Sequence, residues 1–282
     1  MAHIKNPLEW TAAEFGSAAG HVRGATRSVY GSEAPPTLRR IAVGDLRDAL
    51  RRGFDDFAAC RTDVIFLCLI YPLAGLVLAR FALNQAFLPL LFPLASGFAL
   101  LGPVAAVGLY EMSREREQGV RVSWAHAFGV TRAPSFGAIV VLSLILLALF
   151  LAWLGAAVVL YALTLGPEAP ASLSAFATDV FTTPAGWAMI GIGVAVGFVF
   201  AVVALAISVV SYPILLDHDV GLATAIGTSV RAVRQNPRTM AVWGLIVAGG
   251  LVLGTIPAFV GLIVVLPVLG HATWHLYRKL VA

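Results

Sequence analysis

Charge is scarce in this sequence. Asp, Glu, Lys and Arg make up only 12% of the 282 residues, whereas 59% are hydrophobic. Soluble domains carry about 25% charged residues, so this composition excludes an ordinary soluble protein and predicts a membrane protein. The basic residues are interleaved with acidic ones, as in Arg51-Arg52 followed by Asp55-Asp56. This pattern predicts a salt-bridged helix surface facing lipid headgroups, and we expect no nucleic-acid partner.

Cysteine and lysine are scarce too, and no secretory signal is evident. Cys60 and Cys68 are eight residues apart, which fits neither a metal knuckle nor a disulfide framework, so we interpret both as reduced packing residues. Only Lys5 and Lys279 among the nineteen basic residues are lysine, which hints at a GC-rich bacterial genome. The first forty residues lack an apolar run. We therefore expect no cleavable signal peptide.

Long uncharged stretches dominate the rest of the chain. Residues 138–165, 180–216 and 239–277 contain no charged side chain. About 20 helical residues cross the hydrocarbon core, so each stretch can span a bilayer. The third stretch is thirty-nine residues long, and we expect it to fold back at Gly254–Pro257. The six predicted spans are Val64–Leu83, Leu88–Tyr110, Ala138–Leu165, Gly186–Tyr212, Met240–Leu253 and Ala258–Tyr277.

The basic residues predict the orientation of these spans. With six crossings, the segments 1–63, 111–135, 213–239 and 278–282 share one face, and they contain eighteen of the nineteen Lys and Arg residues. The exception is Arg80, near a helix end. Positive residues concentrate on the cytoplasmic side of membrane proteins. We therefore expect a protein of the bacterial inner membrane with both termini in the cytoplasm. The opposite face has only short connections, near Asn84-Gln85, from Gly166 to about Ala185, and at Gly254.

An amphipathic segment precedes each predicted pair of spans. Apolar residues at helical spacing define the expected buried face of each segment. These are Val43, Leu46, Leu50, Phe54 and Phe57 in Val43–Phe57, Trp124 and Phe128 in Val122–Arg132, and Leu222, Ile226, Val230 and Val233 in Leu222–Arg234.

The three units share further features. Each amphipathic segment ends in a polar break, and each following pair of spans ends in a tyrosine near charge. The breaks are Arg61-Thr62-Asp63, Arg132-Ala133-Pro134 and Gln235-Asn236-Pro237, and the tyrosines are Tyr110, Tyr212 and Tyr277. This layout predicts a threefold repeat of interfacial helix, span, turn and span.

Two domains are predicted. Residues 1–40 form an N-terminal cytoplasmic arm, amphipathic or partly disordered, in which Asn6, Pro7 and Glu9 resemble a helix start. Residues 41–282 form the six-span membrane domain.

The histidines are the main candidates for chemistry. His271 and His275 are four residues apart, a spacing that lets two imidazoles reach one metal, but Ala272 occupies the position of the glutamate in a zinc-protease motif. Beside Trp274 and Tyr277, interfacial packing explains both histidines. The Asp217-His218-Asp219 cluster is expected to be a helix cap and solvated turn. The alternative is a cation site, and its candidate ligands are His126, Asp217, His218, His271 and His275.

Transport is a separate hypothesis. Inside the spans only hydroxyls such as those of Ser143, Thr164 and Ser208 are available, and no ion-coupling carboxylate is evident. Helix interruptions occur at Pro93, Gly102, Pro103, Pro257 and Pro267. Broken helices can form a midplane binding site, but we interpret these interruptions as packing kinks in preference. There is no Gly-rich phosphate loop and no Gly-x-Ser-x-Gly motif, so we do not expect an enzyme, and no cofactor is expected.

Three stretches carry a family resemblance. They are RIAVGDLRDALRRGFDDFAACRTDVIFLCLIYPLAGLVLAR, FPLASGFALLGPVAAVGLYEMSRERE and LPVLGHATWHLYRKLV. They resemble an uncharacterised family of bacterial six-span membrane proteins, the domain of unknown function numbered 2189, whose members are often labelled cytochrome c oxidase subunits. The resemblance covers about residues 40–282 and implies topology but no catalytic residues. A catalytic haem–copper subunit would need more histidines within its spans than His271 and His275.

These observations predict an all-α membrane protein with six transmembrane helices arranged as three hairpins, each preceded by a cytoplasmic-side amphipathic helix. The expected function is a non-enzymatic scaffold, or an accessory or assembly subunit of a respiratory or other membrane complex. The alternative is a permease for a small or lipid-like solute that uses the Gly/Pro-broken helices. The expected partners are the lipid bilayer and such a complex.

Overall fold

The computed structural model describes residues 36–82, 85–133, 135–257 and 260–281, so most of the predicted N-terminal arm and Asn84 lie outside the described residues. In chain order the helices are α2 (Val43–Ala82), the 3-10 helix η1 (Gln85–Leu90), α3 (Leu91–Glu117), the 3-10 helix η2 (Trp124–Arg132), α4 (Phe136–Thr164), α5 (Leu173–Thr182), α6 (Pro184–Ser208), α7 (Ser211–Asp217), α8 (Leu222–Gln235), α9 (Pro237–Thr255) and α10 (Leu262–Leu280). The predicted all-helical class is confirmed.

Three described helices are long and apolar enough to cross a membrane. They are α4, the stretch Pro184–Asp217 that joins α6 to α7, and α9. A fourth candidate results if 87–97 and 99–117 form one span bent by 40°. The bend lies between residues 97 and 99, and Pro103 inside α3 has no backbone N–H to donate to the carbonyl of Ala99, which gives the bend a local cause.

Local sequence sets the ends of these helices. After α4, Gly166 has a φ of +98° and Pro167 follows it, so the glycine accepts the left-handed conformation and the proline prevents continuation. At the start of α6, the Thr183 hydroxyl accepts a hydrogen bond from the Gly186 amide at 3.0 Å, and Pro184 occupies the first turn. Helix α9 ends at Thr255, within the turn predicted at Gly254–Pro257, and the connection to α10 begins at Ile256.

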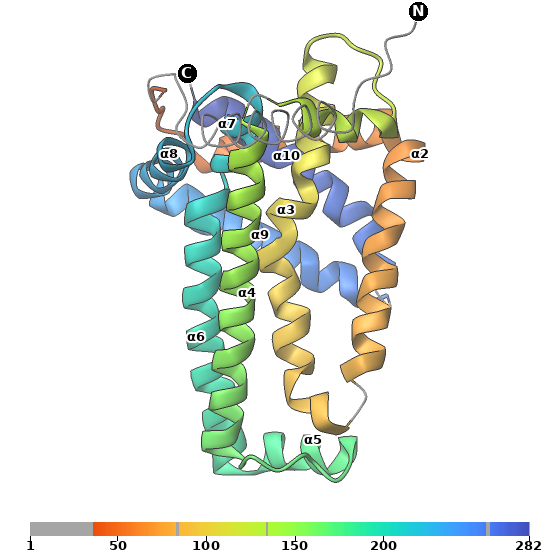
Figure 1. Cartoon of the computed structure of the whole chain (residues 1–282), viewed down its shortest axis with the longest axis vertical. Helices are drawn as coiled ribbons and strands as arrows, with labels where there is room; N and C mark the ends of the chain where they lie inside the picture. The colour runs from red at the N-terminus through yellow and green to blue at the C-terminus, as the bar shows by residue number, and fades with distance from the viewer. Residues whose placement is uncertain (1–35, 83–84, 134, 258–259, 282) are drawn as a thin grey trace, which may run out of the picture.

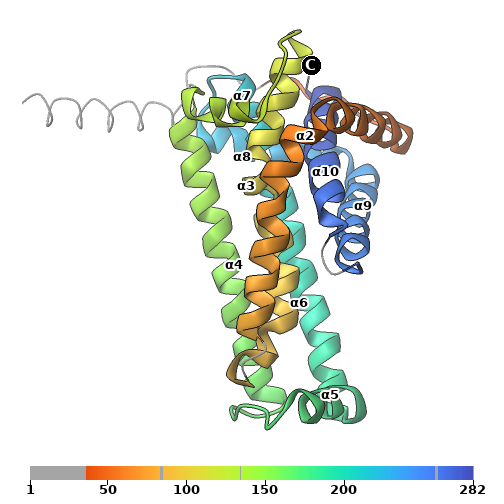
Figure 2. The ribbon, with the colours of Figure 1, turned by 90° about the vertical axis from the view of Figure 1, so that its right-hand side faces the viewer.

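The helices form an elongated bundle whose two ends differ (Figure 1). Helices α3, α4 and α6 run along its length, and α5 lies across one end. The other end carries η2, α7, α8 and the C-terminal end of α10 (Figure 1). Helices α9 and α10 occupy only the part of the bundle next to this second end (Figure 2). We call the second end the polar end, because most charged side chains belong to its segments.

Helix α2 differs from the prediction in two ways. It continues through Arg61-Thr62-Asp63, which therefore do not break the helix. Its first part lies across the polar end and the rest runs along the bundle (Figure 2). The predicted apolar face is wrong in part, because Val43 is exposed and Phe54 is 54% exposed. The buried face comprises Leu46, Ala49, Gly53, Asp56, Phe57 and Cys60.

This shifted face follows from close contact with α10. A Cβ atom at Gly53 would lie 2.6 Å from the backbone nitrogen of Ala272, so only glycine permits this approach of the two helices. The larger Phe54 side chain cannot occupy the same face at that distance and points outward. Backbone proximity, and not side-chain hydrophobicity, therefore decides which face of α2 is buried.

Two other segments also differ from expectation. The segment Val122–Arg132 contains a 3-10 helix instead of an α-helix. A four-residue spacing does not place two residues on one face of a 3-10 helix, and Phe128 is exposed. The connection from Gly166 to about Ala185 contains α5, which Ser172 caps through the Ala175 amide at 3.1 Å. In α8 the deepest residues are Ala225, Thr228, Ser229 and Ala232, and the predicted apolar residues are half-buried beside them.

The core lies mainly toward the polar end. Every residue from Gly270 to Tyr277 in α10 is buried, as are Ser211–Leu216 in α7. A helix buried on all faces is enclosed by its neighbours, here chiefly α2 and α3. The three repeat tyrosines, Tyr110, Tyr212 and Tyr277, belong to one hydrophobic cluster. The residues that end the three predicted hairpins therefore meet in one place.

Candidate functional site: a buried polar network

Five side chains from three helices form a hydrogen-bonded group at the polar end. We call them the polar network: Asp56 from α2, Ser113 and Arg116 from α3, and His271 and His275 from α10. Asp56 is only 4% exposed and His271 only 1%. Burial of this many polar groups costs free energy unless each has a partner, so the pattern of bonds determines what the network can do.

Asp56 is the acceptor at the centre of the network. Its Oδ2 atom accepts from Ser113 Oγ at 2.6 Å and lies 2.8 Å from His275 Nε2. Its Oδ1 atom accepts from the Arg116 guanidinium. Burial raises the pKa of Asp56, but the hydrogen bonds from His275 and Ser113 outweigh it and hold the pKa below its ordinary value. The carboxylate is therefore ionised at neutral pH.

This charge fixes the direction of the remaining bonds. The Ser113 hydroxyl donates its proton to the ionised Asp56, so at His271 Nδ1, 2.7 Å away, the serine oxygen acts as acceptor. His271 then carries its proton on Nδ1. Its Nε2 atom is buried and has no hydrogen-bond partner among the described residues. The network thus runs from His271 through Ser113 to Asp56 and His275.

A second set of polar contacts joins α10 to α3 and α7. The Tyr277 hydroxyl donates to Asp217 Oδ2 at 2.8 Å, and Arg278 pairs with the same atom at 3.3 Å. Trp274 Nε1 donates to Glu117 Oε2 at 3.2 Å. Lys279 pairs with Asp48 at 2.8 Å and with Asp45 at 3.4 Å. The C-terminal end of α10 is therefore bonded to α2, α3 and α7.

Asn236 provides a third link. Its Oδ1 atom accepts from the Ile41 amide at 2.8 Å, and its Nδ2 atom donates to the carbonyls of Arg39 and Ala232. Thr239 donates to the Ile41 carbonyl at 3.0 Å. The sequence Gln235-Asn236-Pro237, predicted as a polar break, is thus also an anchor for the segment that precedes α2.

The predicted metal-ligand candidates do not converge. His271 and His275 lie in the polar network, where both are buried and not in an outward-facing interfacial belt as predicted. His126 forms a capping box with Ser123, its Nδ1 atom accepting from the Ser123 amide at 3.0 Å. Asp217 binds Tyr277, and His218 lies 3.6 Å from Asp217. Within the described ranges, no group of three or more His, Cys, Asp or Glu side chains has a metal-binding arrangement.

The candidate pathway residues are likewise occupied by packing contacts. Ser143 donates to the Ile139 carbonyl at 2.8 Å and lies 3.1 Å from the Tyr212 hydroxyl. Ser208 is buried and donates to the Ala204 carbonyl at 2.6 Å. Pro103 and Pro267 lie inside α3 and α10, and Pro257 lies in the α9–α10 connection. These serines do not line an open vestibule.

The sequence predicted that Asp56 lies on an exposed, salt-bridged surface, but the structure buries it. Its neighbours Arg51, Arg52 and Asp55 are exposed, as the salt-bridged surface predicts, but Asp56 is not. A sequence signal exists, because Asp56 follows Gly53 by three residues and therefore shares its helix face. The partners on α3 and α10 could not be identified from spacing alone.

Comparison with known protein families gives one match, which covers the middle of the chain. Residues 91–217 match the model of a family described as a predicted integral membrane protein, DUF2189. Residues 91–217 of the chain are therefore similar to the DUF2189 family. The suspected resemblance is confirmed over α3 to α7, a shorter range than the residues 40–282 expected. The DUF2189 segment contains Ser113 and Arg116 of the polar network, whereas Asp56, His271 and His275 lie outside it. No curated protein and no solved structure gave a match.

Proposed function

We propose that this integral membrane protein is a non-enzymatic scaffold, or an accessory or assembly subunit of a membrane complex. One observation carries the proposal: the polar groups at the polar end bond helix to helix. Asp56, His275 and Tyr277 each hold two helices together. Such bonds make a rigid platform, which suits a protein that presents a surface to a partner.

The proposed topology has six crossings. The spans are α2, the combined η1 and α3, and then α4, α6, α9 and α10. In a bacterial inner membrane, the polar end and both termini would then face the cytoplasm. This orientation is supported by the location of the described basic residues, of which only Arg80 belongs to the opposite end. The amphipathic segments at the polar end would lie at the level of the lipid headgroups.

Two exposed aromatic side chains mark the surface that a partner would use. Phe54 on α2 and Phe128 on η2 are more than half exposed although both belong to the polar end. Large exposed aromatic residues are common at protein interfaces. We propose that a neighbouring subunit of a respiratory or other membrane complex covers them.

Co-purification tests this function. Tagged full-length protein is isolated from native membranes in mild detergent, and its associated proteins are identified. We expect a defined set of membrane proteins that is lost in Phe54→Ser or Phe128→Ser. Phe181→Ser, which alters a similarly exposed residue on α5 at the opposite end, should leave the set unchanged. Equal recovery with all three variants would contradict docking at the polar end.

A permease is the second candidate, and the 40° bend before Pro103 favours it. Gly102 precedes Pro103, and a Cβ atom at Gly102 would meet no other atom within 4 Å. There is therefore open space on α3 about one turn from the bend. Solute flux into vesicles that contain the purified protein would support this candidate. Flux that Gly102→Leu does not alter would argue against a pathway at this bend.

A further inference from the structure

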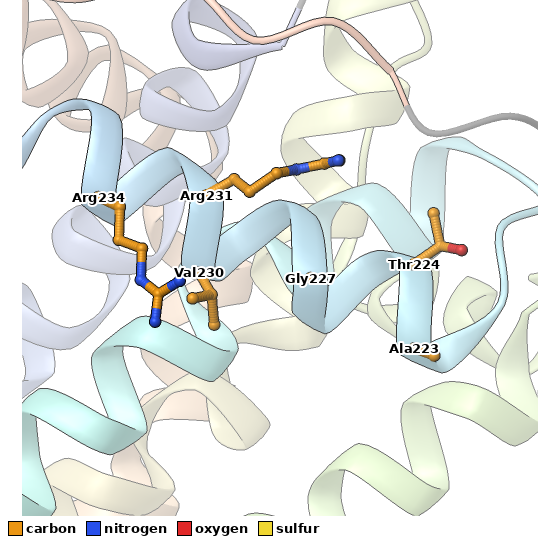
Figure 3. A pocket seen from close by; sticks show the side chains of 6 residues that line it. All are labelled: Ala223, Thr224, Gly227, Val230, Arg231 and Arg234. Atoms are coloured by element: carbon orange, nitrogen blue, oxygen red, sulfur yellow. The ribbon is translucent and has the colours of Figure 1, made fainter.

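The outer face of α8 has an arrangement that the packing of the bundle does not explain. Ala223, Thr224, Gly227, Val230, Arg231 and Arg234 line a shallow depression of about 550 Å³. Figure 3 shows the Arg231 side chain reaching back along the helix toward Gly227, while Arg234 extends on the other side of Val230. A Cβ atom at Gly227 would meet nothing within 4 Å, so the floor of the depression is open.

Four arginines of the described residues take part in an ion pair with a carboxylate, and Arg231 and Arg234 are not among them. Arg114, Arg116 and Arg278 each pair with a carboxylate of another residue at the polar end. Arg231 donates to the Thr228 hydroxyl at 3.0 Å. In the described part of the chain, neither Arg231 nor Arg234 has a carboxylate oxygen within 4.0 Å. Two guanidinium groups therefore lie beside an open depression without an ion-pair partner among the described residues.

The chain itself offers little negative charge to this face. From residue 220 to residue 282 the sequence contains five basic residues and no acidic residue. The N-terminal residues 1–35 contain three basic and three acidic residues, so they carry no net negative charge. Charge complementarity therefore points to an anion from outside the chain.

The position of α8 selects the kind of anion. The helix packs against α6 and α7, at the end of a stretch that is long and apolar enough to cross a membrane. A helix at the end of a span lies at the depth of the lipid phosphates. Planar guanidinium groups bind phosphate through paired hydrogen bonds, and the Thr224 hydroxyl at the rim is a further donor.

We propose that the depression on α8 binds the headgroup of an anionic phospholipid, whose negative charge is attracted by Arg231 and Arg234. This inference rests on the proposed function, because it names the lipid that the polar end contacts. The acyl chains of that lipid extend along the exposed apolar side chains of α6, such as Val199, Val202 and Val203. The site is a specific one on α8 and not a general property of basic residues.

Retention of phosphatidylglycerol by the purified full-length protein tests the site. The protein is reconstituted in phosphatidylcholine nanodiscs with increasing phosphatidylglycerol, and bound lipid is counted by native mass spectrometry. Each guanidinium near a membrane surface contributes about fivefold to binding, so Arg231→Gln with Arg234→Gln should weaken retention roughly thirtyfold. Gly227→Glu should weaken it as well, since a carboxylate would then lie one turn from Arg231.

Matched controls use the same residue types. Gly227→Ala adds a methyl group in open space and should retain the lipid. Arg80→Gln removes an exposed arginine from the opposite end and should also retain it. The altered side chains on α8 are exposed, so thermal unfolding of the variants should match that of the unaltered protein. Equal weakening by Arg80→Gln would show a non-specific charge effect and would overturn the proposal.

Other occupants are identified by a photo-crosslinking amino acid at position 227. A lipid adduct supports the proposal, whereas an adduct within residues 1–35 or with another protein overturns it. Displacement of the lipid by inorganic phosphate, but not by chloride at equal ionic strength, would identify free phosphate as the ligand and also overturn it. Because these measurements use purified protein, their failure leaves the co-purification result intact, and the two proposals can fail separately.

Discussion

Replacing Asp56 by alanine removes the shared acceptor of the polar network. The Ser113 hydroxyl, the His275 ring and the Arg116 guanidinium each lose a partner. The Arg116 side chain is 38% exposed and can turn to water, so it contributes little to the cost. Ser113 keeps the hydrogen bond that its oxygen accepts from His271 Nδ1, and the loss of the acceptor for its hydroxyl proton costs about 1 kcal/mol.

His275 has no such alternative. Its side chain is 10% exposed, and Nε2 would remain buried without an acceptor, which costs about 2 kcal/mol. The expected loss in the free energy of unfolding for Asp56→Ala is therefore about 3 kcal/mol. Asp56→Asn keeps one acceptor oxygen for Ser113 and should cost about half as much.

Unfolding in mixed micelles of a mild detergent and sodium dodecyl sulfate, followed by tryptophan fluorescence, measures this loss. Asp55→Ala is the control, because the neighbouring carboxylate is exposed and its removal should change the free energy by less than about 0.5 kcal/mol. Equal effects of Asp55→Ala and Asp56→Ala would refute the reasoning. If Asp56→Ala does not fold, comparison of Asp56→Asn with Asp55→Asn provides the same test.

Three of the four further predictions use the same unfolding assay, and the last uses a distance between spin labels. Gly53→Ala should destabilise the protein by about 2 kcal/mol or more because its methyl group would contact the Ala272 backbone, whereas Gly44→Ala, in open space, should be neutral or slightly stabilising; equal effects would contradict the close contact. The hydrogen bonds that lower the pKa of Asp56 stabilise the fold above the ordinary value of 3.8, so this stability should be lost as the pH falls through the depressed pKa; an acid limb unchanged in Asp56→Asn would refute it. Tyr277→Phe should cost about 1 kcal/mol, since Asp217 retains Arg278, and an unchanged free energy of unfolding would contradict a role for this hydrogen bond in stability. Pro103→Ala should reduce the 40° bend, as measured by the distance between spin labels at the two ends of α3, and an unchanged distance would show that the proline does not cause it.

Composition was sufficient to predict the class of fold. Uncharged runs correspond to α4, to α6 and to α9, because a helix that satisfies its own backbone groups is the simplest way for such a run to cross lipid. The helix ends at Gly166 and Pro184 follow from local rules and could also be predicted. The repeat tyrosines were found by pattern, and the structure gives them a common location.

The polar network could not be predicted, since it depends on which helix faces meet. Asp56 and His275 are more than two hundred residues apart, and no spacing rule connects them. The face of α2 was assigned from its largest apolar residues, but contact with α10 is decided by Gly53, which has no side chain. Amphipathic patterns report hydrophobicity, and they miss interfaces in which small and polar residues are the ones that become buried.

The uneven distribution of polar bonds has a mechanical consequence. Hydrogen bonds and ion pairs join α2, α3, α7 and α10 at one end of the bundle. Toward the other end, the described residues have one side-chain hydrogen bond between α4 and α3, from Trp153 Nε1 to the Pro93 carbonyl. Stiffness should therefore decrease along the bundle axis. A change in bilayer thickness would change the spacing of the helices near α5 and leave the bonded end unchanged. Only the leaflet that surrounds the α5 end would therefore see the protein change shape.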